Sequence, residues 1–182
     1  MQSTSSFWRD ANRVPITANG LMVSKSITTN AAAATLNVPL FTVTGVVEVI
    51  ALYGIVTTDL GSNQTAAYWR SYDQTAGVNI TLNTGTTMSS AKAGSLLVKK
   101  DLATAALTLS NASAARVTEP TTLETSYFST FVIAQKTGSV KTEIEYIYTT
   151  STNPTTGAIQ FFCGFIPLSS DGDIAVSTTV AY

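Results

Sequence analysis

The stretch LFTVTGVVEVIALYGIVTTD, residues 40–59, decides the fold class of this chain. It contains two strand-length runs of Val, Ile, Leu, Thr and Tyr, and it includes Gly45 and Gly54, which we expect to mark bulges or bends. Because the apolar residues are nearly continuous, both faces of these strands are expected to be buried. The stretch therefore predicts two adjoining core strands of a β-sheet protein.

Strand patterns continue on the C-terminal side of this stretch, with turn signals roughly every 8 to 14 residues and no helix of about ten residues. We predict the further strands over residues 67–72, 78–82, 96–99, 103–109, 127–134, 140–148, 158–166 and 174–178. The fold class is therefore predicted to be all-β, an antiparallel β-sandwich or a partly closed Greek-key barrel of about nine strands.

Two of these segments alternate between apolar and polar residues, as half-buried strands do. In residues 140–148, the face that carries Ile144 is predicted to lie in the core. The opposite face, which carries Glu143 and Glu145, is expected to be charged and solvated. The alternation over residues 78–82 likewise predicts a half-buried strand.

The chain is predicted to divide into an extended N-terminal arm, residues 1–37, and a β-sandwich domain, residues 38–182. The length of 182 residues corresponds to about one domain with its own core. Apolar residues in the arm recur with the period of neither a strand nor a helix. We expect the arm to lie across its own domain or to be held by a neighbouring subunit.

The composition favours a β-rich protein with an uncharged polar surface. Hydrophobic residues make up 45% of the chain and charged residues only 12%, about half the usual share. The polar surface must come from hydroxyl side chains instead, since the chain has 31 Thr and 19 Ser. Thr is β-branched and suits a pleated, half-buried surface.

Several classes of chemistry are excluded by residues that the sequence lacks. There is no His, which excludes Ser-His-Asp and Cys-His triads and His-ligated zinc. The single cysteine, Cys163, excludes an intramolecular disulfide and a cysteine metal cluster. We therefore expect neither a metal nor another cofactor.

The charge and hydropathy patterns also limit the partners. A net charge of −1, with Lys and Arg scattered, argues against direct binding to nucleic acid. No run of 18 apolar residues predicts a membrane span, and the first residues, MQSTSS, lack the charged and apolar regions of a signal peptide. We expect a protein that is made in a cytoplasm, without a cleaved signal and without a membrane partner.

The carboxylates are the remaining candidates for acid–base chemistry. Glu143 and Glu145 share one strand face, as a glycosidase pair would, but a solvated face beside Lys141 is the favoured interpretation. Asp171 and Asp173 flank a glycine, as at the start of a calcium loop. The rest of that loop's ligand pattern is missing, so a plain turn is favoured.

Cys163 and a group of aromatic residues are candidates for reactivity or binding. Cys163 lies among phenylalanines, where burial would raise the pKa of its thiol, so we expect an inert core residue. Tyr68, Trp69 and Tyr72, together with Arg70, are predicted to contribute to a contact between subunits, or to stack on a sugar or a base. Because the aromatic residues fall on both faces of a strand, at least one face is expected to pack into the core or into a subunit contact.

The arm contains the strongest candidates for a subunit interface. These are Phe7, Trp8, Arg9 and Arg13, which have no core of their own to pack against. Trp and Arg are frequent anchors of protein interfaces. Docking on a neighbouring subunit is favoured over docking on the same chain.

Three segments resemble the head decoration (cement) and minor capsid proteins of tailed bacteriophages. They are LFTVTGVVEVIALYGIVTTDL at residues 40–60, GSLL at 94–97 and GFIPLSSDGDIAVSTT at 164–179. In that family a hydrophobic strand pair opens the domain, and an aromatic-Pro-Leu-Ser segment followed by Gly and Val closes it. The resemblance covers most of residues 38–180 and leaves the arm outside. It implies an all-β protein that binds the outer surface of a capsid, often as a trimer.

The first hypothesis is a non-enzymatic virion protein that stabilises an icosahedral phage head. Its expected partners are the major capsid protein and itself, as a homotrimer, and its expected location is the capsid surface. Low charge and many hydroxyl groups suit extended contacts, because few charges would have to be desolvated.

Two alternatives stay open. One is a tail-tube, connector or fibre-base subunit of a virion. The other is a carbohydrate-binding β-sandwich that stacks sugar on Tyr68, Trp69 and Tyr72. An enzyme is the least expected class, since Glu143 and Glu145 are its sole support.

Overall fold

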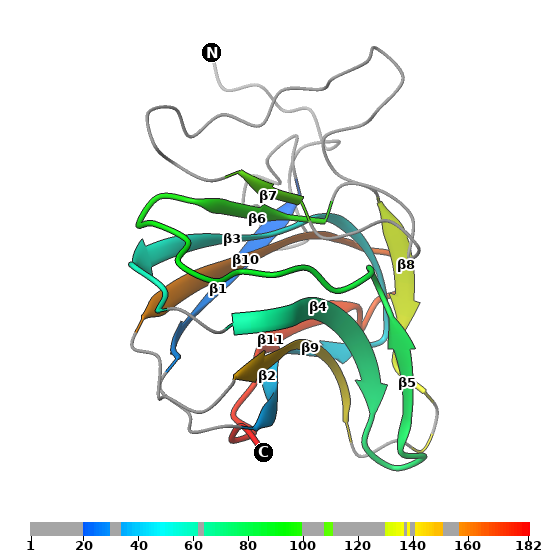
Figure 1. The fold of residues 1–182 in the computed structure, drawn as a ribbon. Helices are drawn as coiled ribbons and strands as arrows, with labels where there is room; N and C mark the ends of the chain where they lie inside the picture. Colours follow the sequence, from blue (N-terminus) through cyan, green and yellow to red (C-terminus); the bar gives the residue numbers. More distant parts are fainter. Residues whose placement is uncertain are drawn as a thin grey trace, which may run out of the picture.

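The chain forms a two-layered all-β structure (Figure 1). The computed structural model describes residues 20–29, 34–61, 64–99, 108–110, 130–136, 138, 141–150 and 157–182. Eleven strands and no helix lie within these ranges, and so no described segment is a helix that could cross a membrane. The predicted all-β class is confirmed, with two more strands than expected.

The strands form two antiparallel sheets. The first sheet contains β1 (Leu21–Thr28), β3 (Val46–Thr58), β6 (Leu96–Val98), β7 (Thr108–Ser110), β8 (Phe131–Ala134) and β10 (Ala158–Pro167). Its order is β1-β10-β3-β6-β7, and β8 pairs with β3 next to β6. The second sheet contains β2 (Thr35–Thr44), β4 (Gln64–Asp73), β5 (Val78–Thr81), β9 (Thr142–Thr150) and β11 (Asp173–Val176). Its order is β11-β2-β9-β4-β5.

The connections between these strands give the topology of a jelly roll. Strands β1, β3 and β10 lie in one sheet, while β2, β4 and β9 lie in the other, so the chain changes sheets at most connections. Strand β10 inserts between β1 and β3, and β9 inserts between β2 and β4. These two long-range insertions are the paired Greek keys of a jelly roll, to which β11 is added beside β2. Of the two predicted architectures, the sandwich is the one observed.

Two glycines explain how the stretch at residues 40–59 serves both sheets. Gly45 carries the chain from β2 to β3 with a φ of 57°, and a Cβ there would lie 2.7 Å from the Gly172 nitrogen. The bend predicted at Gly45 is confirmed. Gly54 is paired in register with Phe161, and a Cβ there would lie 2.9 Å from that ring. The bulge or bend predicted at Gly54 is wrong, because this glycine makes room for a core aromatic side chain.

An aromatic cluster forms the centre of the core between the sheets. Trp69 of β4, Tyr146 of β9 and Phe161 of β10 are each 0% exposed. The ring centroids of Trp69 and Phe161 are 6.3 Å apart, and those of Tyr146 and Phe161 are 4.8 Å apart. Residues that alternate with Trp69 and Tyr146 therefore point to the outer face of the second sheet.

The predicted arm is shorter than expected, because residues 21–28 and 35–37 belong to strands of the sandwich. Strand β1 pairs along its whole length with β10, from Leu21 with Phe165 to Thr28 with Ala158. Its period was missed because an edge strand that faces solvent on one side needs few apolar residues. Residues 1–19 lie outside the described residues.

The half-buried strand predicted at residues 78–82 is also wrong in its burial. All four residues of β5 are exposed, with Val78 and Ile80 at 57% and 65%. The reason is that β5 is an edge strand, paired among the described residues with β4 alone, so the facing sheet covers it less than it covers a central strand. Leu82, just after the strand, is buried.

Candidate functional site

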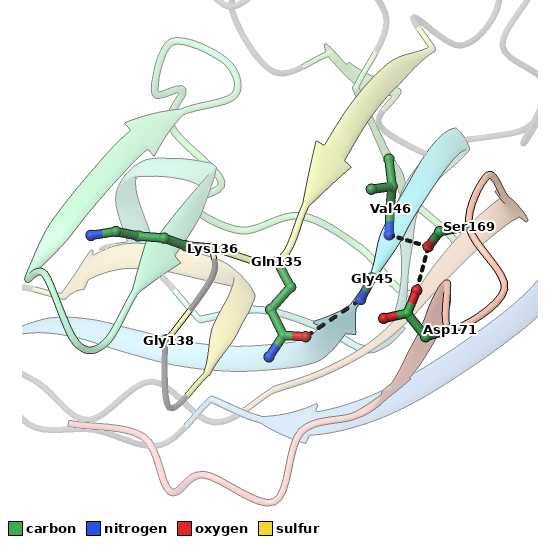
Figure 2. Close-up of a pocket in the computed structure, with 7 residues that line it drawn as sticks. All are labelled: Gly45, Val46, Gln135, Lys136, Gly138, Ser169 and Asp171. Atoms are coloured by element: carbon green, nitrogen blue, oxygen red, sulfur yellow. Dashed lines mark hydrogen bonds between the residues drawn. The ribbon is translucent and has the colours of Figure 1, made fainter.

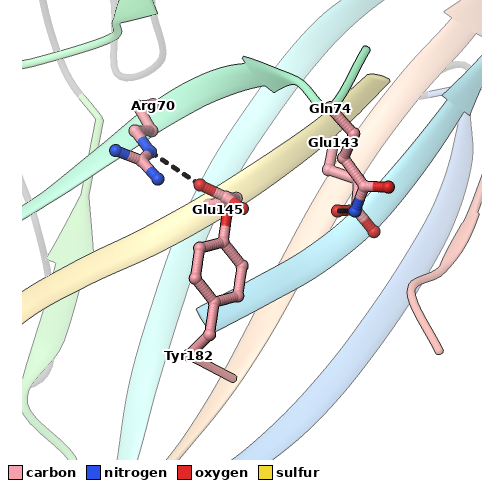
Figure 3. Close-up of polar contacts among 5 residues, drawn as sticks. All are labelled: Arg70, Gln74, Glu143, Glu145 and Tyr182. Atoms are coloured by element: carbon pink, nitrogen blue, oxygen red, sulfur yellow. Dashed lines mark hydrogen bonds and ion pairs between the residues drawn. The ribbon is translucent and has the colours of Figure 1, made fainter. Parts of the chain in front are cut away.

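The outer face of β9 carries two buried carboxylates. Glu143 and Glu145 are both 0% exposed, although the strand pattern predicted a solvated charged face. That prediction is wrong because other parts of the chain cover this face of the sheet. Figure 3 shows the two carboxylates with three of their partners from neighbouring elements.

Glu145 is held by one cation and one hydroxyl group. Arg70 Nε donates to Glu145 Oε2 at 2.6 Å, and the Tyr182 hydroxyl donates to Oε1 at 3.0 Å (Figure 3). Burial alone would lower the pKa of Arg70, but the hydrogen bond and the charge of Glu145 raise it above its usual value. Desolvation and the same carboxylate raise the pKa of Tyr182. The guanidinium therefore stays charged and the phenol stays protonated at neutral pH.

Glu143 is bound by the end of the chain, residues 177–182, which we call the C-terminal strap. The hydroxyl groups of Ser177 and Thr179 donate to Glu143 Oε1, the second at 2.8 Å. Gln74 Nε2 donates to Oε2 at 2.8 Å. Backbone bonds fix the strap along β2, since Tyr182 N donates to Asn37 O at 3.1 Å. All four carboxylate oxygens of the pair thus accept hydrogen bonds from the protein itself.

Lys25 closes one side of the sandwich. It lies on β1 in the first sheet, and its amine donates to Pro39 O of β2 at 2.6 Å and to Ser177 O of the strap at 2.9 Å. Burial lowers the pKa of this amine, and the charge of Glu143 opposes that change. We call the side formed by β1, β11 and the strap the closed edge.

The aromatic residues of β4 separate onto the two faces of the sheet. Trp69 lies in the core, so the prediction that it contributes to an outer surface is wrong, because strand alternation places it inward with Ala67. Tyr68 and Tyr72 are half-buried on the outer face. The Arg70 guanidinium lies over the Tyr72 ring, 5.0 Å from its centroid, and the Tyr182 ring lies 6.4 Å from that of Tyr72.

A polar pocket of about 370 Å³ lies where the chain crosses between the sheets (Figure 2). Val46 N donates to Ser169 Oγ at 2.8 Å, and Ser169 Oγ donates to Asp171 Oδ1 at 2.6 Å. The side-chain oxygen of Gln135 accepts from Gly45 N at 3.4 Å. These groups hold the β2–β3 crossover and the turn that precedes β11, in agreement with the plain turn predicted at Asp171.

Cys163 is a buried residue of β10, as predicted. Burial raises the pKa of its thiol from 9.0 to about 12. The thiol is therefore protonated and unreactive at neutral pH.

The side of the sandwich opposite the closed edge is different, and we call β5 and β8 there the open edge (Figure 1). Val78 and Ile80 of β5 and Val132 of β8 are exposed, the last at 61%. Two cavities of about 250 and 290 Å³ lie between the sheets at this edge, and both are lined by Ser71, Ile80 and Ala134. The open edge is therefore an apolar groove.

Sequence patterns missed most of what surrounds the carboxylates. The strap follows a predicted strand, and its hydroxyl groups resemble the other Ser and Thr of the chain. Tyr182 lies outside every predicted strand, so no strand pattern indicated its contact with Glu145. The predicted arm residues Phe7, Trp8, Arg9 and Arg13 lie outside the described residues. Among those described, no group of three or more Cys, Asp or Glu could hold a metal ion.

Comparisons with known proteins add no relative to this description. No family model matches the chain, and neither the curated proteins nor the solved structures gave a match.

Proposed function

We propose that this chain is a non-enzymatic structural protein of a virion, which decorates an icosahedral phage head. It binds the major capsid protein on the outer surface of the head and associates with itself as a homotrimer. It is made in the host cytoplasm and needs no cofactor.

The open edge is the observation that carries the proposal. The closed edge is covered by the chain itself, whereas the open edge exposes apolar side chains and, among the described residues, strands with one unpaired side. A neighbouring subunit can pair with these strands or pack against these side chains. Jelly rolls form capsid subunits and also lectin domains, so the topology alone leaves the function open. The buried carboxylates favour a structural role, because each oxygen already accepts a hydrogen bond.

Immunogold electron microscopy on particles of the virus that encodes the chain tests this proposal. Antibodies raised against the purified protein are expected to label the heads evenly. Labelled tails would support the alternative of a tail-tube, connector or fibre-base subunit. Particles without label would contradict both virion roles.

A carbohydrate-binding module is the second candidate, since Tyr72, Tyr182 and Arg70 form a half-exposed aromatic surface on the outer face of the second sheet. Aromatic rings beside a cation can stack on sugars. Binding to a glycan array that is lost in Tyr72→Ala and kept in Val132→Ala would favour this candidate. No binding to any glycan would remove it.

A further inference from the structure

Within the part of the chain that the structure describes, two strands of the open edge each have one unpaired side. Among the described residues, β5 pairs with β4 alone and β8 pairs with β3 alone. Natural proteins usually cover such edges or place charges on them. Here the side chains beside the free edges are Val78, Ile80 and Val132, all more than half exposed. An additional strand would gain backbone hydrogen bonds and apolar contacts at the same place.

The groove beside these edges is lined by residues of both sheets. Its two cavities share Ser71, Ile80 and Ala134, so they lie next to each other between the sheets. One end is bordered by Asp73 and Lys136, and the other by apolar residues that include Leu82 and Phe131. A segment with apolar anchors and few charges matches this lining.

The chain itself supplies such a segment. Nineteen residues precede Gly20 in the sequence, and they include Phe7, Trp8, Val14 and Ile16. These apolar residues have no strand pattern that would place them in the sandwich core. They are spaced along ten residues, which corresponds to about 33 Å of extended chain.

The position of β1 lets the segment reach a groove on another copy. Register pairs connect Leu21 to Phe165, Phe165 to Val49 and Val49 to Phe131, so the start of β1 lies three strand spacings from β8. Three spacings are about 14 Å, whereas the residues between Trp8 and Gly20 span up to about 40 Å when extended. The segment is therefore long enough for a groove on another copy, and the self-association proposed above favours that copy over its own chain.

We infer that the open edge is a β-augmentation site that receives residues 7–16 of a second copy of this chain. The segment lies along the groove over Ile80 and adds a strand beside β5. This inference deepens the proposed function, on whose self-association it rests, and it names the surface by which the copies join.

Light scattering on the purified full-length chain and its variants tests the groove. The full-length chain is expected to be an oligomer, and Ile80→Lys is expected to have the mass of a single chain. Leu168→Lys is the matched control, because Leu168 is 52% exposed and lies outside the groove. Circular dichroism checks that each variant is folded, and Val78→Lys is a second variant in the same groove. An Ile80→Lys chain that is folded and keeps the full-length mass would overturn the inference.

A mixing experiment then separates exchange between copies from docking on the same chain. A chain that lacks residues 1–19 keeps the groove, and the Ile80→Lys chain keeps the segment. Each is expected to be monomeric alone, and the mixture is expected to form a one-to-one complex. A mixture that stays monomeric would overturn the exchange between copies.

These results can be distinguished from a failure of the proposed function. Heads that are labelled by antibody, with an oligomer that ignores the groove variants, would leave the virion role intact and overturn the groove. Unlabelled particles would overturn the virion role, even if the groove variants abolish self-association.

Discussion

The two long sides of the sandwich differ in how their edge strands are covered. At the closed edge, Lys25 ties β1 to the second sheet, and the C-terminal strap covers the face that carries Glu143 and Glu145. At the open edge, β5 and β8 present exposed apolar side chains and a groove. The polar groups of the closed edge are satisfied within the chain, so this edge maintains the fold. The open edge offers surface to a partner.

The largest expected effect comes from the buried ion pair on the sheet face that the strap covers. Arg70→Met leaves Glu145 buried without its cation, and we expect a loss of about 3 kcal/mol in the free energy of unfolding. Urea denaturation measures this loss, and adding Glu145→Gln should restore part of it. Lys92→Met is the control, since it removes an exposed pair with Asp59, and its midpoint should stay unchanged. Equal losses in Arg70→Met and Lys92→Met would show that the buried ion pair stabilises the fold no more than the exposed one.

The next effect concerns the strap. Ser177→Ala removes a donor to the buried Glu143 carboxylate, with an expected loss of about 2 kcal/mol. Thr178→Ala changes the exposed neighbouring residue and should cost little. Hydrogen exchange should also show faster exchange at Asn37 and Tyr182, whose backbone groups hold the strap to β2. Unchanged exchange there would mean that the strap does not depend on Glu143.

The strands could be predicted from the sequence, but the contacts that cover Glu143 could not. The run at residues 40–59 predicted β3 and the second half of β2, because continuous β-branched and apolar residues determine strands locally. The alternation in β9 separated its two faces correctly and placed Ile144 in the core, but the face of Glu143 and Glu145 is buried and not solvated. The cover over Glu143 comes from Ser177 and Thr179, 34 and 36 residues away, and no local pattern announces that contact. Trp69 was uncertain for the same reason, since its inward direction depends on which face of β4 meets the first sheet.

A smaller effect follows from Cys163, which pairs in register with Val23 of the edge strand β1. Its pKa rises from 9.0 to about 12 on folding, so the unfolded chain loses a proton that the folded chain keeps. The free energy of unfolding should therefore fall from pH 9 to pH 12, by roughly 1 kcal/mol at pH 10. Comparing pH profiles of the natural chain and Cys163→Ala isolates this part. If the two chains have parallel pH profiles, the thiol is not shielded from solvent.

The smallest effect on stability is expected at the open edge. Ile80→Lys changes a residue that is 65% exposed, so the free energy of unfolding should change by less than about 0.5 kcal/mol. Thermal unfolding at low protein concentration measures it without a contribution from association. A strong destabilisation would place Ile80 in the fold of the single chain and would remove the difference between the two edges.

The most direct test of this account is the solution mass of the full-length chain beside that of Ile80→Lys, by size-exclusion chromatography with light scattering. The account predicts a discrete oligomer, a trimer with three times the 19.1 kDa chain mass, that becomes a single folded chain in the variant. A full-length chain that is itself monomeric, or an oligomer that the variant leaves intact, would contradict the role assigned to the open edge.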